Sequence, residues 1–182
     1  MSENQGKDGE MRFGIVIAAA SIHENGLDYT RHTVTNQPDL GLDYSLQGRA
    51  TTLVSFCEVG VGKALPSIRE TLGAPERRVD ARVDVKTTES KLTGVTVDKF
   101  VSDVRKHPNT DLHILVGGNA LTKSAEKKFE SHRDALRDAG KAIVYIPNEG
   151  AARLAKKYQP EILGALDGPL GSDKDDSGDQ GI

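Results

Sequence analysis

The sequence has no tryptophan, a single cysteine and few aromatic residues. Aromatic residues make up 4% and hydrophobic residues 36% of the 182 positions, so a core must be built from Val, Ile, Leu and Ala. The single Cys57 excludes an intramolecular disulfide, and it lacks the spaced Cys and His partners of a structural zinc site. A reducing cytoplasm is the simplest setting for such a chain.

Long apolar runs are absent as well. No run approaches the roughly 18 residues that a membrane-spanning helix needs. The short apolar segment 13–20 could belong to a secretory signal, but acidic Glu3, Asp8 and Glu10 precede it where a signal carries positive charge. We therefore expect a cytoplasmic protein of one domain with tails, and no membrane partner.

The net charge of −3 is unusual for a protein that binds nucleic acid, but the acidity lies at the two ends of the chain. Residues 171–182 contain four aspartates and one lysine, and residues 1–10 contain three acidic residues and one lysine. Residues 11–170 therefore carry a net charge of +2. This mildly basic body permits DNA binding without demonstrating it.

Hydrophobic periodicity predicts an α/β domain over residues 11–167, between disordered tails at 1–10 and 168–182. Its first part should contain a helix that ends at Asn25-Gly26, an extended segment over 27–37 and a strand over 40–46. Residues 45–80 are expected to form an insertion, in which Thr51–Phe56 is β-like and 65–72 helical.

The C-terminal half shows the clearest alternation of strands and helices. Strands are expected near 81–87, 112–116 and 142–146, with helices near 97–106, 121–139 and 151–158. Thr122 is a plausible N-cap. This order predicts a central mixed sheet flanked by helices, in which the later strands pair in parallel through right-handed crossovers.

Asp84 and Lys86 are the main candidates for chemistry. Residues two apart in a strand point to the same face, so a carboxylate and an ammonium would project together. The carboxylate can bind Mg²⁺, and the ammonium can orient an attacking water or stabilise the charge of a phosphoryl transition state. Such a site needs a second acid, and Asp43 on the preceding strand could supply it.

A simpler interpretation of Asp84 and Lys86 is a solvated strand end, and taken alone this tripeptide pattern favours it. The second acid is also open, since Gly-Leu-Asp-Tyr occurs at both 26–29 and 41–44. Asp28 is therefore a rival to Asp43.

The order of elements changes this balance, because the chain resembles the Mrr-like branch of the restriction-endonuclease-like, or PD-(D/E)xK, nucleases. That family runs from a helix ending in glycine to a Gly-x-Asp strand, an acid-x-Lys strand, and then alternating helices and strands. The resemblance covers roughly residues 12–158. The matching segments are Asn25-Gly26-Leu27, Pro38-Asp39-Leu40-Gly41-Leu42-Asp43, Val83-Asp84-Val85-Lys86-Thr87-Thr88, Val95-Thr96-Val97-Asp98-Lys99-Phe100, Ile114-Leu115-Val116-Gly117 and Leu121-Thr122-Lys123-Ser124-Ala125-Glu126.

The resemblance implies a restriction-endonuclease-like core and a Mg²⁺- or Mn²⁺-dependent endonuclease that acts on DNA in restriction, repair or junction resolution. Asp43 and Asp84, with the backbone carbonyl of Val85, would hold the metal, and Lys86 would assist the attacking water. The expected partners are DNA and, in a homodimer, a second copy of the chain.

The sequence departs from the family pattern in several places. Asp84 stands where Glu or Gln is more usual, and the segment between the two acidic strands is long. The acid that the family often has in its first helix matches neither Glu10 nor Glu24 securely. Two rivals follow: an inactive member of the fold that binds nucleic acid or protein, and an unrelated α/β domain that binds a small ligand at its strand ends.

Overall fold

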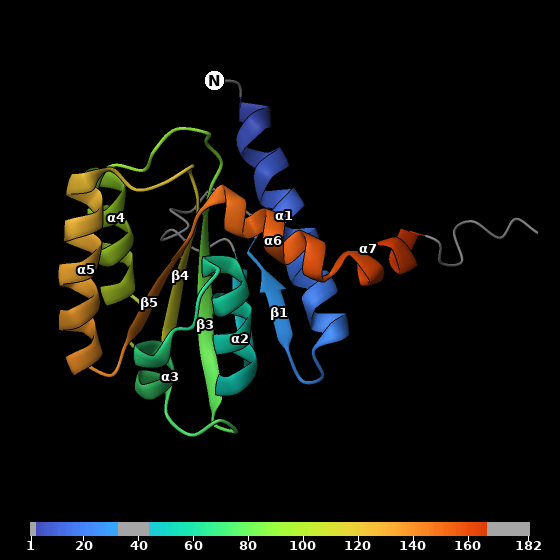
Figure 1. Ribbon diagram of the computed structural model, residues 1–182, viewed down its shortest axis with the longest axis horizontal. Helices are drawn as coiled ribbons and strands as arrows, with labels where there is room; N and C mark the ends of the chain where they lie inside the picture. Colours follow the sequence, from blue (N-terminus) through green and yellow to red (C-terminus); the bar gives the residue numbers. More distant parts are fainter. Residues whose placement is uncertain (1–2, 33–43, 167–182) are drawn as a thin grey trace, which may run out of the picture.

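The computed structural model describes residues 3–32 and 44–166, which fold as helices on both sides of one sheet (Figure 1). The strands are β1 (Asp28–Arg31), β2 (Tyr44–Arg49), β3 (Arg78–Lys86), β4 (Leu112–Gly117) and β5 (Ala142–Ile146). The helices are α1 (Glu3–His23), α2 (Ala50–Val61), α3 (Pro66–Leu72), α4 (Gly94–Arg105), α5 (Lys123–Asp138), α6 (Asn148–Lys157) and α7 (Gln159–Leu166).

The five strands form one mixed sheet in the order β1-β2-β3-β4-β5. The pairs β1–β2 and β2–β3 are antiparallel, and Tyr44 of β2 lies opposite Val83 of β3. The pairs β3–β4 and β4–β5 are parallel, as the alternation of strands and helices predicts. The carboxyl ends of these three parallel strands therefore meet at one edge of the sheet.

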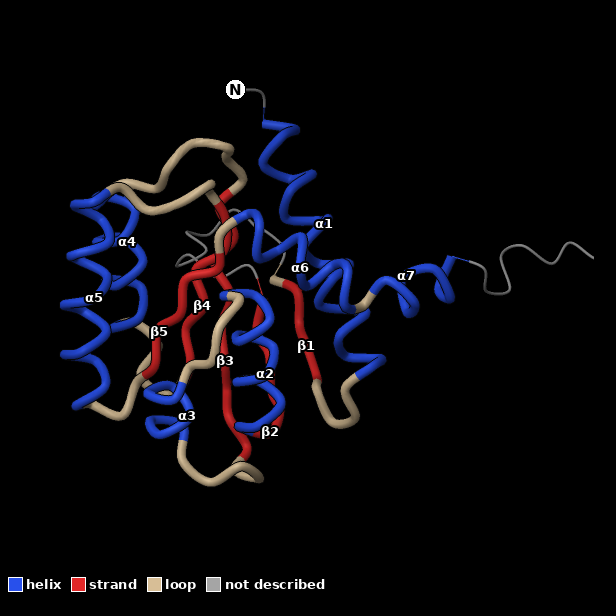
Figure 2. The backbone as a smooth tube through the Cα atoms, viewed as in Figure 1, coloured by secondary structure: helices blue, strands red, loops and turns tan. Residues whose placement is uncertain are grey.

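The two faces of the sheet are covered by different helices (Figures 1 and 2). On the α4–α5 face, these two helices pack Phe100, Val101 and Phe129 against Leu115 and Ile143 of the sheet. On the opposite side, which we call the α1–α6 face, helices α1, α2, α3 and α6 cover a larger apolar core. Aliphatic residues make up most of this larger core, as the composition predicts.

The α/β class, the central mixed sheet and the flanking helices are confirmed. Strands β3, β4 and β5 and helices α4 and α5 lie within a few residues of their predicted ranges. Thr122 is the N-cap of α5, and its hydroxyl accepts a hydrogen bond from the Ala125 amide at 3.2 Å. The expected strand over 40–46 is seen as β2 from Tyr44 onward, and its earlier residues lie outside the described ranges.

The β-like prediction for Thr51–Phe56 is wrong, because these residues belong to α2. The buried positions Ala50, Leu53, Val54 and Cys57 recur at helical spacing, so burial of one helix face overrides the β preference of Thr and Val. Cys57 is fully buried in this core, as a small apolar residue would be.

Helix α1 differs from its prediction at the N-terminal end. It begins at Glu3, so residues 3–10, predicted to be a disordered tail, are helical. The helix buries Phe13 and Ile17, while Met11, Ile15 and Ile22 remain exposed. No helix in the described ranges combines the length and the apolar character needed to cross a membrane.

Candidate functional site

The two faces of β3 carry different side chains. Val79, Ala81 and Val83 are buried in the core of the α1–α6 face. Arg82 and Asp84, at the alternate positions, are each only 1% exposed, and they are the charged residues buried within this strand. Because side chains alternate along a strand, Arg82, Asp84 and Lys86 share the α4–α5 face.

Asp84 is held by two cations. The Lys86 Nζ lies 2.6 Å from Asp84 Oδ1, and the Arg82 guanidinium lies 3.9 Å from Asp84 Oδ2. Among the described residues, no backbone amide or hydroxyl donates a hydrogen bond to Asp84 Oδ1. The two-residue offset read from the sequence therefore brings Asp84 and Lys86 into direct contact, while the predicted solvated strand end is not seen for Asp84.

The environment of Asp84 opposes its ionisation. Burial raises the pKa of the Asp84 carboxyl above its usual range, more than the nearby charges of Lys86 and Arg82 lower it. The Asp103 carboxylate on α4 also raises this pKa. An additional positive charge at this position would therefore stabilise the ionised carboxylate.

Other buried polar groups surround this ion pair on the α4–α5 face. The Arg82 guanidinium lies 5.6 Å from the ring centroid of Phe100 in a cation–π contact. His113 lies opposite Arg82 in the parallel ladder and is 0% exposed. Burial and the Arg82 charge lower the pKa of His113 to about 3, so its imidazole is neutral at pH 7.

The second predicted acid, Asp43, lies outside the described residues. It directly precedes Tyr44, which pairs with Val83, the residue before Asp84. The rival Asp28 is far from Asp84: the ladder aligns it with Gln47 and Asp80, and four residues of strand separate Asp80 from Asp84, about 13 Å. The Asp28 carboxylate also binds Arg78 at 2.9 Å.

The predicted metal centre is incomplete within residues 3–32 and 44–166, because no three His, Cys, Asp or Glu side chains are grouped there so as to hold an ion. Val85 lies between Asp84 and Lys86 and pairs with Val116 of β4. Glu24, one candidate for the acid of the first helix, instead accepts a hydrogen bond from the Tyr158 hydroxyl at 3.2 Å. Within the described residues, Asp84 is the carboxylate that forms an ion pair with Lys86.

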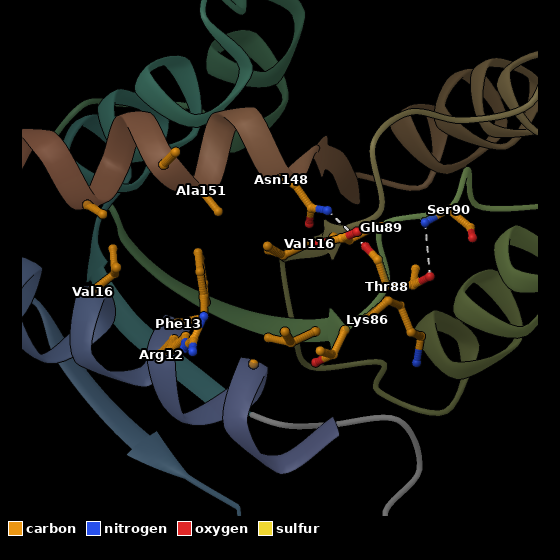
Figure 3. A pocket seen from close by; sticks show the side chains of 16 residues that line it. Arg12, Phe13, Val16, Lys86, Thr88, Glu89, Ser90, Val116, Asn148 and Ala151 are labelled. Atoms are coloured by element: carbon orange, nitrogen blue, oxygen red, sulfur yellow. Dashed lines mark hydrogen bonds between the residues drawn. The ribbon is translucent and has the colours of Figure 1, made fainter. Parts of the chain in front are cut away.

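A cavity of about 980 Å³ opens between α1 and α6 at the carboxyl ends of β3 and β4, where Lys86 lines it and Asp84 does not (Figure 3). We call it the α1–α6 cavity. Its apolar wall consists of Phe13, Val16, Val85, Val116, Ala151 and Ala155. Its polar lining includes Arg12, Lys86, Thr88, Glu89, Ser90 and Asn148.

Loops at the strand ends shape one side of this cavity. Gly117 has φ +121°, and a Cβ there would overlap the Lys86 carbonyl, so only glycine lets these two strand ends approach so closely. The Tyr145 hydroxyl donates to the Gly117 carbonyl at 2.9 Å. The Asn148 amide donates to the Thr88 carbonyl at 2.8 Å and so ties the loop after β3 to α6.

This cavity was not predicted from the sequence. Its lining comes from four segments that are distant in the sequence, in α1, at the end of β3, at the end of β4 and in α6, and no single segment has a recognisable spacing. The signals in the sequence were Gly117-Gly118 at the end of a buried strand, and Arg12 directly before the apolar run 13–20.

No family model matches the chain, and no curated protein or solved structure shows significant similarity to it.

Proposed function

We propose that this protein is a metal-dependent nuclease that hydrolyses DNA phosphodiester bonds, with Asp43, Asp84 and Lys86 as its site residues. The observation that carries the proposal is the contact between Lys86 Nζ and Asp84 Oδ1, 2.6 Å apart near the carboxyl end of β3. The Lys86 side chain is 28% exposed, so its ammonium is within reach of a bound phosphate.

The arrangement of elements supports a restriction-endonuclease-like core. Helix α1 precedes three antiparallel strands, β1, β2 and β3, and α4 then connects β3 to the parallel strand β4. This is the order that the resemblance implies. Helices α2 and α3, which lie between β2 and β3, correspond to the expected insertion.

The surroundings of Asp84 fit a divalent cation. Its carboxylate is buried and has a raised pKa, and its Oδ1 accepts no hydrogen bond from a described amide or hydroxyl, so a cation would relieve an unfavourable charge. Asp84, Asp43 and the Val85 carbonyl would hold Mg²⁺ or Mn²⁺ through oxygen atoms, the ligands that these ions prefer. When bound, the ion would activate a water molecule and polarise the phosphate.

The residues of the chain have separate tasks in this proposal. Lys86 exchanges its ion pair with Asp84 for the phosphate and offsets the negative charge that develops there. Arg82 is buried and remains beside Asp84 when Lys86 leaves, so the carboxylate retains a counter-ion. His113 is neutral at pH 7, so it adds no positive charge to this buried cluster.

A second candidate is an inactive member of the same fold that binds nucleic acid. It is favoured by the 1% exposure of Asp84 and by the two cations that already balance its charge. Both candidates would bind DNA, but only the nuclease would cleave it.

The deciding experiment incubates supercoiled plasmid with purified protein and Mg²⁺ or Mn²⁺, with EDTA as the metal-free control. We expect the wild type to nick or linearise the plasmid, and Asp84→Asn to be inactive although folded. Lys128→Ala is a matched control, since Lys128 is an exposed lysine of α5 that pairs with Asp98. Binding of DNA by the wild type without cleavage in either metal would instead establish the inactive binder.

A further inference from the structure

We infer that the α1–α6 cavity binds one nucleotide unit, with the base against the apolar wall and the phosphate near Arg12. The nucleotide could come from a DNA strand or from free nucleotide in solution, and the chemistry of recognition is shared. Only the DNA source rests on the proposed nuclease function.

The size and polarity of the cavity suit such a ligand. Small-molecule sites typically occupy about 300–1,000 Å³ and combine an apolar lining with a few polar groups. The volume of about 980 Å³ lies within this range and exceeds that of a single base. Phe13 and Val16 from α1 and Ala151 from α6 line the apolar part, against which a planar ring can pack (Figure 3).

The polar lining offers groups that match both ends of a nucleotide. Arg12 is exposed, and its guanidinium forms no ion pair with any described residue, so it is available to a phosphate. Glu89 and Ser90 lie on the loop after β3, away from Arg12 (Figure 3). A carboxylate and a hydroxyl there can accept hydrogen bonds from the amino group of a base.

The position of the cavity adds a third argument. In open α/β sheets, ligands bind in crevices outside the carboxyl ends of parallel strands, and this cavity lies at the ends of β3 and β4. Lys86 lines the cavity and also contacts Asp84. A DNA strand with a phosphate at Lys86 would therefore have a neighbouring nucleotide beside the cavity.

The test uses 2-aminopurine, a fluorescent purine, in two forms: the deoxyribonucleoside monophosphate and a single-stranded oligonucleotide that contains one 2-aminopurine. Saturable fluorescence change with the monophosphate identifies free nucleotide as a ligand, and a change with the oligonucleotide alone identifies the DNA strand. No saturable change with either probe overturns the inference.

Two variants and two matched controls locate the binding. Arg12→Ala should weaken binding by roughly tenfold, the loss typical of one charge-assisted contact to phosphate. Ala151→Leu should weaken it at least as much by filling the cavity. Arg105→Ala and Ala135→Leu change an exposed arginine of α4 and an exposed alanine of α5, so they should bind as the wild type does. Unchanged affinity in folded Arg12→Ala and Ala151→Leu would overturn the inference.

Failure of the cavity inference can be distinguished from failure of the nuclease proposal. Probe binding that both variants weaken, in a protein that does not cleave plasmid, retains the cavity inference and rejects the nuclease. Plasmid cleavage by a protein whose probe binding neither variant alters rejects the cavity inference and retains the nuclease. Arg12→Ala tests the inference even if Ala151→Leu fails to fold, because Arg12 is exposed.

Discussion

Strand β3 has an aliphatic side toward the α1–α6 face and a charged side toward the α4–α5 face. Val79 and Val83 are both 0% exposed on the first side, where they stabilise the fold by removing apolar surface from water. Arg82 and Asp84 are equally buried on the second side, where each charge loses its hydration. Burial therefore stabilises the aliphatic side of β3, whereas on the charged side it is energetically unfavourable.

This difference is informative about function. A buried ion pair is weak evidence for stability, since well-packed aliphatic residues of similar volume often stabilise a fold as well or better. The pKa of Asp84 stays raised in spite of two neighbouring cations, so the pairing does not compensate for the burial of the carboxylate. The charged side therefore suits the chemistry proposed at the end of β3, which would give these buried charges a use other than stability.

The largest expected effect concerns Lys86 on the charged side. Lys86→Ala should reduce DNA cleavage by roughly two to four orders of magnitude, because one electrostatic group at the reacting phosphate is lost. DNA affinity should fall only modestly, because binding is spread over many phosphate contacts. Plasmid cleavage and gel shifts on the same preparations check this, and equal cleavage by wild type and variant would remove Lys86 from the mechanism.

The next effect tests the buried charge itself. Arg82→Ala should lower the free energy of unfolding by about 3–5 kcal/mol, because it leaves Asp84 with one cation fewer and removes the contact with Phe100. Urea unfolding at pH 7 measures this. A loss below about 1 kcal/mol, the size expected of an exposed ion pair, would show that Arg82 is not the buried partner of Asp84.

Divalent cations should stabilise the charged side. A ligand at 100 times its Kd that binds only the folded state adds about 2.7 kcal/mol, so Mg²⁺ or Mn²⁺ should raise the Tm. Asp84→Asn and Asp43→Asn should each abolish this rise, while Asp80→Asn, at the far end of β3, should retain it. A Tm that does not change with saturating metal would count against a preformed site.

The aliphatic side should respond to truncation in a simpler way. Val83→Ala should lower the free energy of unfolding by about 2 kcal/mol through lost burial and the small cavity that remains. Cleavage by the folded fraction should stay unchanged, since Val83 points away from Lys86. Loss of cleavage with no loss of stability would contradict the separation of the two sides.

The sequence predicted the elements whose pattern is local. The run Leu112–Val116 is apolar except for His113 and lies between Asp111 and Gly117, so a buried strand was the simplest interpretation. The contact between Asp84 and Lys86 also follows from a local rule, the two-residue period of a strand. Both predictions depend on residues that are close together in the chain.

Features that depend on distant segments could not be predicted. The burial of Asp84 arises because the face it shares with Arg82 is covered by α4 and α5, and no local pattern gives that depth. The α1–α6 cavity requires Arg12, Lys86 and Asn148 to meet from three separate elements. The helix α2 was missed because its core-facing spacing competes with a local preference for strand.

The smallest expected effect is a pH dependence that arises from His113 on the charged side. Its pKa is about 3 in the folded protein and near 6.5 when unfolded, so the stability contributed by neutral His113 is fully present above pH 6.5. That stability is lost as the pH falls from 6.5 toward 3, because only the unfolded state binds the proton. The slope is about 1.4 kcal/mol per pH unit within this window. His113→Gln should flatten the curve of unfolding free energy between pH 6 and pH 5, whereas His32→Gln, at an exposed histidine that follows β1, serves as the control. Urea unfolding at several pH values measures both slopes, and an equally steep loss in the His113 variant would show that the imidazole is not buried in its neutral form.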